Sequence, residues 1–335
     1  MLETTAYCGH STRQALVMKT LHLFLLLILC TTIAFAQKKK LPPGLPSGVT
    51  LLKDLAYVEK GHARQKLDLY LPAEAKESLP LIIWVHGGAW EGGSKEQCQP
   101  LHQGFLSKGY AIASINYRLS QHAIFPAQLE DCKAAIRWLR AEAKTYNLNP
   151  DRFAAYGGSA GGHLAALIGT TGNIKTFDVG GNLTLSSRVQ AVCDYYGPSD
   201  FLYNENNLSP EFSKRLNDPA AAVPRLLGGP VKEKRDAALK ASPVTYVTNQ
   251  ALPPFLIVHG DKDPLVPITQ SERLFNVLRD AKGNVHLHCI KGAGHGNGCF
   301  GAENDARVVL FFDRWLKNPP TQQPPVAQRT ESFAQ

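Results

Sequence analysis

The stretch RFAAYGGSAGGHLAALIG, residues 152–169, carries one serine between two pairs of glycines. An apolar run precedes the glycines and a helix-forming run follows them, so we expect a strand that turns directly into a helix at Ser159. Glycine is costly inside regular structure but suits places where the chain turns sharply. The serine therefore stands at a tight turn, where the N-terminus of the helix favours developing negative charge.

Residues 157–161 fit the G-x-S-x-G pattern of a nucleophile elbow. The pentapeptide alone is a moderate signal, because glycine-rich strand–helix turns have other uses. A second glycine-rich loop, HGGAW at residues 86–90, follows the apolar run IIWV. Such a loop can bring backbone N–H groups close to a substrate oxyanion. The candidate oxyanion donors are the N–H groups of Gly88, Ala89 and Ala160.

A candidate acid and a candidate base follow two later apolar runs. PFLIVHGDKDPLVP, residues 254–267, ends in a loop with two aspartates, and a carboxylate there can orient a histidine. We favour Asp263, because related sequences carry the acid four residues after the histidine of the His-Gly step; Asp261 would then shape the loop. His295 lies in the glycine loop KGAGHGNG, where it can act as a general base. Other histidines are expected to be structural: His163, His259, His286 and His288.

Short apolar runs alternate with segments of helical periodicity over residues 49–317. This alternation predicts one α/β domain, with a mostly parallel sheet covered by helices on both faces. Residues 201–242 break the rhythm, because they are polar and rich in loop formers. They are compatible either with an insertion near a site or with a plain surface excursion.

The composition is globular, with 44% hydrophobic residues in a chain of 335 and a formal net charge of +8. Three of the lysines stand together at 38–40, and no basic stripe with interleaved aromatics follows. We therefore expect no nucleic-acid partner.

The N-terminal region has the features of an export signal. A short positive region at Met18 and Lys19 precedes an apolar run that ends at Ala36. We predict a signal peptide in residues 1–36, with translation starting at Met18, and a protein that is secreted or periplasmic. A membrane anchor is the alternative, but the apolar run is shorter than the ~20 residues of a spanning helix. We expect no stable membrane insertion after cleavage.

Residues 37–48 read as a Pro/Gly/Lys linker, and residues 318–335 as a disordered, proline-rich tail. Export implies an oxidising compartment. Two disulfides are therefore candidates, Cys98–Cys132 and Cys289–Cys299, with free buried thiols as the alternative.

The chain order Ser159, Asp263, His295, with HGGAW upstream, resembles that of α/β-hydrolases. The sequence closely resembles secreted bacterial esterases of the group that includes feruloyl and acetyl-xylan esterases, and it is also similar to hormone-sensitive-lipase-like esterases. The matching stretches span residues 82–296: HGGAW, INYRLSQHAIFPAQLEDCKAAIRWLR, GGSAGGHLAAL, HGDKDPLVP and GAGHG. One departure is Ala89, where a third glycine often stands.

The resemblance implies a serine carboxylesterase that needs no cofactor and no metal, and that acts through an acyl-enzyme. Its substrate would be a small ester or an esterified carbohydrate, with a short-chain or aromatic acyl group. Trp90, Tyr117 and Tyr196 are candidates to line the site, with core packing as the alternative. Two other functions remain open on this fold: an amidase or peptidase, and a catalytically silent binding protein.

Overall fold

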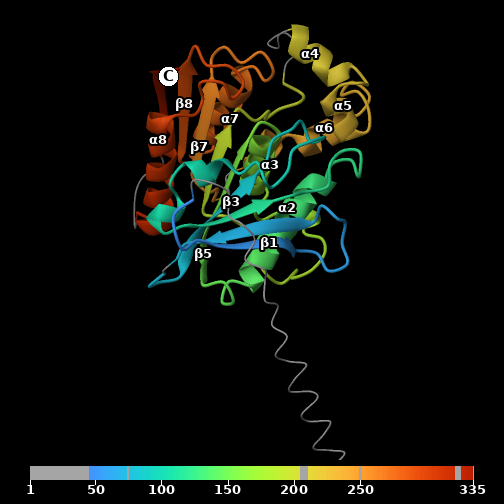
Figure 1. The fold of residues 1–335 in the computed structure, drawn as a ribbon. Coiled ribbons are helices and arrows are strands. Elements are labelled where there is room, and N and C mark those ends of the chain that lie inside the picture. The colour runs from blue at the N-terminus through green and yellow to red at the C-terminus, as the bar shows by residue number, and fades with distance from the viewer. Residues whose placement is uncertain (1–44, 74, 204–209, 249–250, 321–325, 335) are drawn as a thin grey trace, which may run out of the picture. The chain divides into compact units, whose positions relative to one another are not determined.

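The computed structural model describes residues 45–73, 75–203, 210–248, 251–320 and 326–334. All of them belong to one unit, Lys40–Gln335 (Figure 1). The predicted signal peptide and most of the predicted linker lie outside the described residues. Among the residues described, no helix is both long and apolar enough to cross a bilayer.

The described residues form a nine-stranded sheet in the order β1-β2-β4-β3-β5-β6-β7-β8-β9. Strand β2 is antiparallel to both of its neighbours, and every other neighbouring pair is parallel. The strands are β1 (Thr50–Ala56), β2 (Lys66–Leu71), β3 (Leu79–Val85), β4 (Ala111–Ile115), β5 (Leu148–Gly158), β6 (Ala191–Tyr195), β7 (Phe255–Gly260), β8 (Val285–Lys291) and β9 (Ala327–Phe333).

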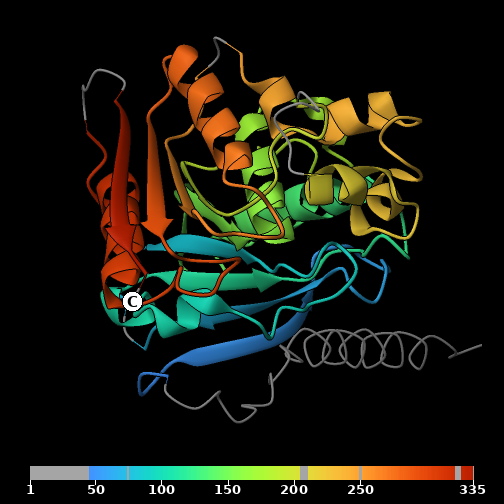
Figure 2. The ribbon, with the colours of Figure 1, turned by 90° about the horizontal axis from the view of Figure 1, so that it is seen from above.

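The near-continuous apolar runs become strands because both faces of the sheet are covered. All seven residues of β3 are buried. Leu81 and Ile83 face one core, while Ile82 and Trp84 face the other. The first core is packed by α2 (Ala127–Ala141), α3 (Ala160–Thr170) and α7 (Thr269–Asp280), and the second by α8 (Ala302–Phe312) (Figure 2). The predicted α/β architecture is therefore confirmed.

The described part of residues 201–242 contains three short helices, α4 (Pro210–Asn217), α5 (Ala222–Leu227) and α6 (Arg235–Ala241). They lie together at one end of the unit (Figure 1). Arg225 of α5 forms an ion pair with Glu91, in the segment that follows HGGAW. This contact favours the insertion near a site over the plain surface excursion.

The prediction of a disordered tail is wrong for residues 327–333. They form β9, which pairs in parallel with β8 from Ala327 opposite Val285 to Phe333 opposite Lys291. The strand has no buried side chain, so it lacks the apolar pattern that marks the other strands. Its support comes from backbone bonds, which carry no sequence signal, and from hydroxyl contacts to β8. The folded domain therefore extends beyond Lys317.

Neither candidate disulfide forms, and all five cysteines of the described residues are free and buried. Cys98 belongs to the core that α8 covers, whereas Cys132 on α2 belongs to the core on the other face of the sheet. Cys299 instead donates its thiol hydrogen to Gly294 O at 3.4 Å.

Candidate active site

Ser159 stands between β5 and α3 in a strained conformation, with φ 57° and ψ −123°. A side chain with positive φ is uncommon, and such strain persists only where the surroundings enforce it. The Ser159 N–H donates to Tyr195 O on the neighbouring strand at 2.8 Å, which fixes the turn from that side. The predicted strand–turn–helix is therefore present.

Close backbone approach explains the glycines around this turn. A Cβ on Gly157 would lie 2.2 Å from Gly161 O, and one on Gly161 would lie 2.0 Å from Val85 O. A Cβ on Gly162 would lie 2.3 Å from Asp194 Oδ1. These distances are far below van der Waals contact. A side chain on Gly157 or Gly161 would force β3, β5 and α3 apart, and one on Gly162 would force α3 away from β6.

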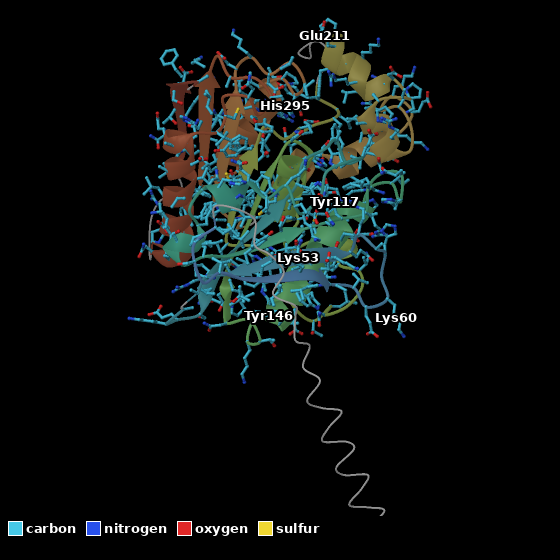
Figure 3. All side chains as sticks on the ribbon, viewed as in Figure 1. Lys53, Lys60, Tyr117, Tyr146, Glu211 and His295 are labelled. Carbon is cyan, nitrogen blue, oxygen red and sulfur yellow. The ribbon has the colours of Figure 1, made fainter. Side chains whose placement is uncertain are left out.

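Ser159, His295 and Asp263 are brought together by the ends of three strands. Ser159 Oγ lies 2.8 Å from His295 Nε2, and His295 Nδ1 lies 2.7 Å from Asp263 Oδ2. The carboxylate can only accept, so Nδ1 carries the proton and Nε2 is free to accept from the serine hydroxyl. The Asp263 side chain is fully buried, whereas His295, which is labelled in Figure 3, keeps 16% of its side chain exposed.

Asp263 is held as an anion by its hydrogen bonds. Burial would raise its pKa, but bonds from His259 and His295 and from the Val266 N–H outweigh burial and hold the pKa well below its usual range. Asp261, the other candidate acid, accepts the Gly292 N–H at 2.7 Å and so shapes the adjoining loop, as predicted.

Three loops meet at Ser159, and we name them by the strands that they follow: the β3 loop (residues 86–93), the β7 loop (261–268) and the β8 loop (292–301). A Cβ on Gly87 would lie 2.8 Å from Gly158 O, so the β3 loop touches the elbow. Within the described residues, the N–H groups of Gly88, Ala89 and Ala160 donate to no protein acceptor. Gly88 and Ala89 line the same cavity as Ser159, and Ala160 follows Ser159 directly in the chain.

Ser159 and His295 open into a cavity of about 610 Å³. Tyr196 lines this cavity, and its ring centroid lies 4.7 Å from that of His295. The wall also includes residues that sequence reasoning missed. Four of them lie in the segment that folds back after β3: Glu96, Gln97, Gln99 and His102. Leu265 of the β7 loop and Phe300 of the β8 loop complete the set.

The other two aromatic candidates lie in the core instead. Tyr117, which is labelled in Figure 3, is fully buried. Its ring stacks on that of His86 with centroids 4.4 Å apart, and its hydroxyl donates to His86 O at 3.0 Å. Trp90 is 4% exposed and donates its indole N–H to His163 Nδ1 at 3.2 Å. Neither is part of the cavity wall. Both side chains pack on the core side of the β3 loop, away from the cavity.

The remaining histidines keep structural contacts. His163 lies 2.7 Å from Ala241 O, and burial lowers its pKa to about 4. His259 lies 2.7 Å from Ser271 Oγ, while His286 and His288 bond to β9. Among the described residues, no group of three or more His, Cys, Asp or Glu side chains is placed to hold a metal ion.

Comparison with known proteins identifies the family of this chain. The family model named BD-FAE matches residues 67–278. A probable carboxylic ester hydrolase of Mycobacterium tuberculosis, LipM, is 34% identical over 267 residues, which are 78% of this chain and 60% of the relative. The chain spans 46–60% of the length of the first three curated relatives that it matches.

Two solved structures have the same fold. A truncated form of a carbohydrate esterase from gut microbiota is 33% identical, with a TM-score of 0.73 over 80% of this chain and 96% of that one. Native esterase Est2 of Thermogutta terrifontis is 26% identical, with a TM-score of 0.63 over 81% of this chain and 93% of that one. The sheet and helices are those of the α/β-hydrolase fold, and the chain belongs to the BD-FAE family.

Proposed function

We propose that this chain is a serine carboxylesterase with Ser159 as nucleophile, His295 as general base and Asp263 as the residue that orients it. The continuous chain of contacts at 2.8 and 2.7 Å carries the proposal. It is supported by relatives named as esterases and carboxylic ester hydrolases.

In the proposed reaction, the Ser159 hydroxyl proton passes to His295 Nε2 as Oγ attacks the acyl carbonyl carbon. The N–H groups of Gly88, Ala89 and Ala160 would stabilise the negative charge on the carbonyl oxygen. His295 then protonates the leaving alcohol, and an acyl-serine remains. A water molecule, deprotonated by His295, attacks the acyl carbon and releases the acid, and Ser159 regains its proton.

A carbohydrate-linked ester is the substrate class that we favour, with a short-chain or aromatic acyl group. Two solved relatives are named as a carbohydrate esterase and as a bifunctional GH43-CE protein of Bacteroides eggerthii, 33% and 32% identical. The cavity of about 610 Å³ is much larger than an acetyl group, and its wall mixes aromatic rings with amide and carboxylate groups. Such a wall suits a sugar-sized alcohol, whose ring faces can pack on aromatic rings while its hydroxyls bond to polar groups.

The first test compares the chain with its Ser159→Ala variant on p-nitrophenyl acetate, butyrate and octanoate. We expect turnover that falls with acyl length and disappears in the variant. Acetylated and feruloylated xylan then test the carbohydrate part. Folded wild-type protein without Ser159-dependent ester turnover would overturn the proposal, and p-nitroanilide substrates would then test an amidase.

We also propose that the protein is exported, because a positive region, an apolar run and Ala34-Phe35-Ala36 stand in signal-peptide order. N-terminal sequencing of the native protein is expected to find Gln37 first. Retention of residues 18–36 on the mature protein would contradict cleavage.

A further inference from the structure

Arg64 lies just before β2, outside every motif of the sequence, and its side chain reaches the β3 loop. Arg64 Nη2 lies 3.1 Å from His86 Nε2 and donates to Gly93 O at 3.0 Å. Arg64 Nε donates to Tyr117 O at 2.8 Å. One half-buried guanidinium thus bonds to both ends of the β3 loop and to the segment that supports it.

The contacts of His86 allow one neutral form of its ring. Its Nδ1 lies 2.7 Å from Gly87 O, which can only accept, so Nδ1 carries the proton. The Arg64 guanidinium can only donate, so His86 Nε2 carries none. Burial lowers the pKa of His86 to about 4, and the charge of Arg64 also lowers it. A second proton would place two N–H groups and two positive charges face to face.

The two ends of the β3 loop, His86–Gly87 and Gly93, lie in close contact beside Arg64. A Cβ on Gly93 would lie 2.4 Å from Gly87 O and 2.6 Å from His86 Nδ1. Between these ends the loop closes on itself, because the N–H groups of Glu91 and Gly92 both donate to Gly88 O. Gly88 and Ala89 follow His86 and Gly87 directly, so a shift at His86 would carry the candidate donors with it.

We propose that Arg64 is the positioning residue of the oxyanion site, an inference that rests on the esterase function proposed above. Its guanidinium holds His86 in the neutral tautomer that bonds to Gly87 O, and it holds the carbonyl of Gly93. The backbone between these points then keeps the N–H groups of Gly88 and Ala89 at the cavity. Without Arg64, His86 can place its proton on Nε2, and its Nδ1 lone pair would repel Gly87 O.

The experiment uses the full chain with Arg64→Gln, Arg64→Lys and Arg64→Ala. Arg140→Ala is the matched control, because Arg140 is also half-buried and donates to backbone carbonyls, of Pro150 and Arg188, away from the cavity. For Arg64→Gln and Arg64→Ala we expect kcat to fall about 10²-fold with KM changed less than threefold, as for loss of an oxyanion donor. Millimolar guanidinium should restore part of the activity that Arg64→Ala loses. It should leave the activity of Arg140→Ala unchanged.

A second readout needs no turnover. In the folded wild type, ¹⁵N NMR of labelled histidine should show His86 with its proton on Nδ1, and Arg64→Gln should move it toward Nε2. If the chain lacks esterase activity but the tautomer moves, the proposed function fails and the positioning contact stands. An unchanged tautomer in folded Arg64→Gln, or a kcat within threefold of wild type, would overturn the proposal. If Arg64→Ala does not fold, Arg64→Lys replaces it in the test. A lysine can bond well to only one of His86 Nε2 and Gly93 O, so we expect a smaller fall in kcat and a smaller shift of the His86 tautomer.

Discussion

The β3 loop and the β7 and β8 loops approach Ser159 from opposite sides of β5, and different forces hold them. The β3 loop depends on backbone shape, with φ 108° at Gly88, 54° at Ala89 and 58° at Trp90. The β7 and β8 loops depend on charge, because the Asp263 carboxylate binds His295 and accepts the Leu265 and Val266 N–H groups. The first side should therefore respond to changes of shape, and the second to changes of charge.

The largest effect is expected from Asp263→Asn, which removes the charge while keeping the size of the side chain. An amide can donate to His295 Nδ1 and so favour the wrong tautomer, and loss of such a carboxylate lowers kcat on the order of 10⁴-fold. Steady-state kinetics against Asp261→Asn checks this, since Asp261 shapes the loop from the backbone side and its variant should stay within tenfold of wild type. Equal losses in the two variants would contradict the assignment of the acid.

A pair of glycine variants tests the shape-dependent side. A Cβ on Gly88 would lie 2.5 Å from Gly92 O and would have to adopt φ 108°, so Gly88→Ala must move the loop. A Cβ on Gly92 would have Gly88 O at 3.8 Å as its nearest neighbour. We expect kcat to fall about 10²–10³-fold in Gly88→Ala and to change little in Gly92→Ala. Full activity of Gly88→Ala would show that the conformation of this loop is not needed.

The two sides should also lose stability in different pH ranges. Burial lowers the pKa of both His86 and His163 from 6.5 to about 4, so the unfolded chain binds these protons more tightly. Each histidine makes its full contribution to stability above pH 6.5. As the pH falls toward 4, each of them loses roughly 3 kcal/mol of this contribution. The pKa of Asp263 is lowered as well, so its contribution is complete above its usual 3.8 and is lost only below that value.

Free energies of unfolding at pH 7, 5 and 3.5 separate these ranges. His163→Gln is expected to lower the slope between pH 7 and 5 by up to about 1.4 kcal/mol per pH unit. Asp263→Asn is expected to leave that slope unchanged and to reduce the loss below pH 4. If Asp263→Asn changed the slope between pH 7 and 5 and His163→Gln did not, the contrast between a buried neutral histidine and a buried charged carboxylate would be contradicted.

The apolar runs were sufficient to predict the strands from β2 to β8, and the chain order of Ser159, Asp263 and His295 was sufficient to predict the residues that meet. Side-chain direction was not predictable in this way. Trp90 points to the core because the β3 loop turns its backbone, not its rings, toward the cavity. Tyr117 follows β4 and is buried against His86. Arg64 gave no signal, because its partners are backbone carbonyls, the Asn116 amide oxygen and one histidine, all far along the chain.

Strand β9 has the weakest sequence signal, and it supports the charge-dependent side. Ala334 N–H donates to Lys291 O at 2.9 Å, where the β8 loop begins. Thr330 Oγ1 lies 2.7 Å from His286 Nε2 and 2.8 Å from His288 Nδ1, so one hydroxyl serves two ring nitrogens. Strands β6 and β7 lie between β5, which leads to Ser159, and the β8–β9 pair. Substitutions in β9 should therefore change stability rather than catalysis.

The smallest effect is therefore expected from Thr330→Val, which keeps the shape and removes the hydroxyl. Two ring nitrogens, one of them on the fully buried His288, lose a partner, so the free energy of unfolding should fall by about 1–3 kcal/mol, with kcat within twofold of wild type. Glu331→Gln is the control on the same strand, because its ion pair with Lys291 is exposed to solvent and weak. Equal destabilisation of the two variants would mean that the histidine contacts do not hold β9, and that its backbone bonds to β8 suffice.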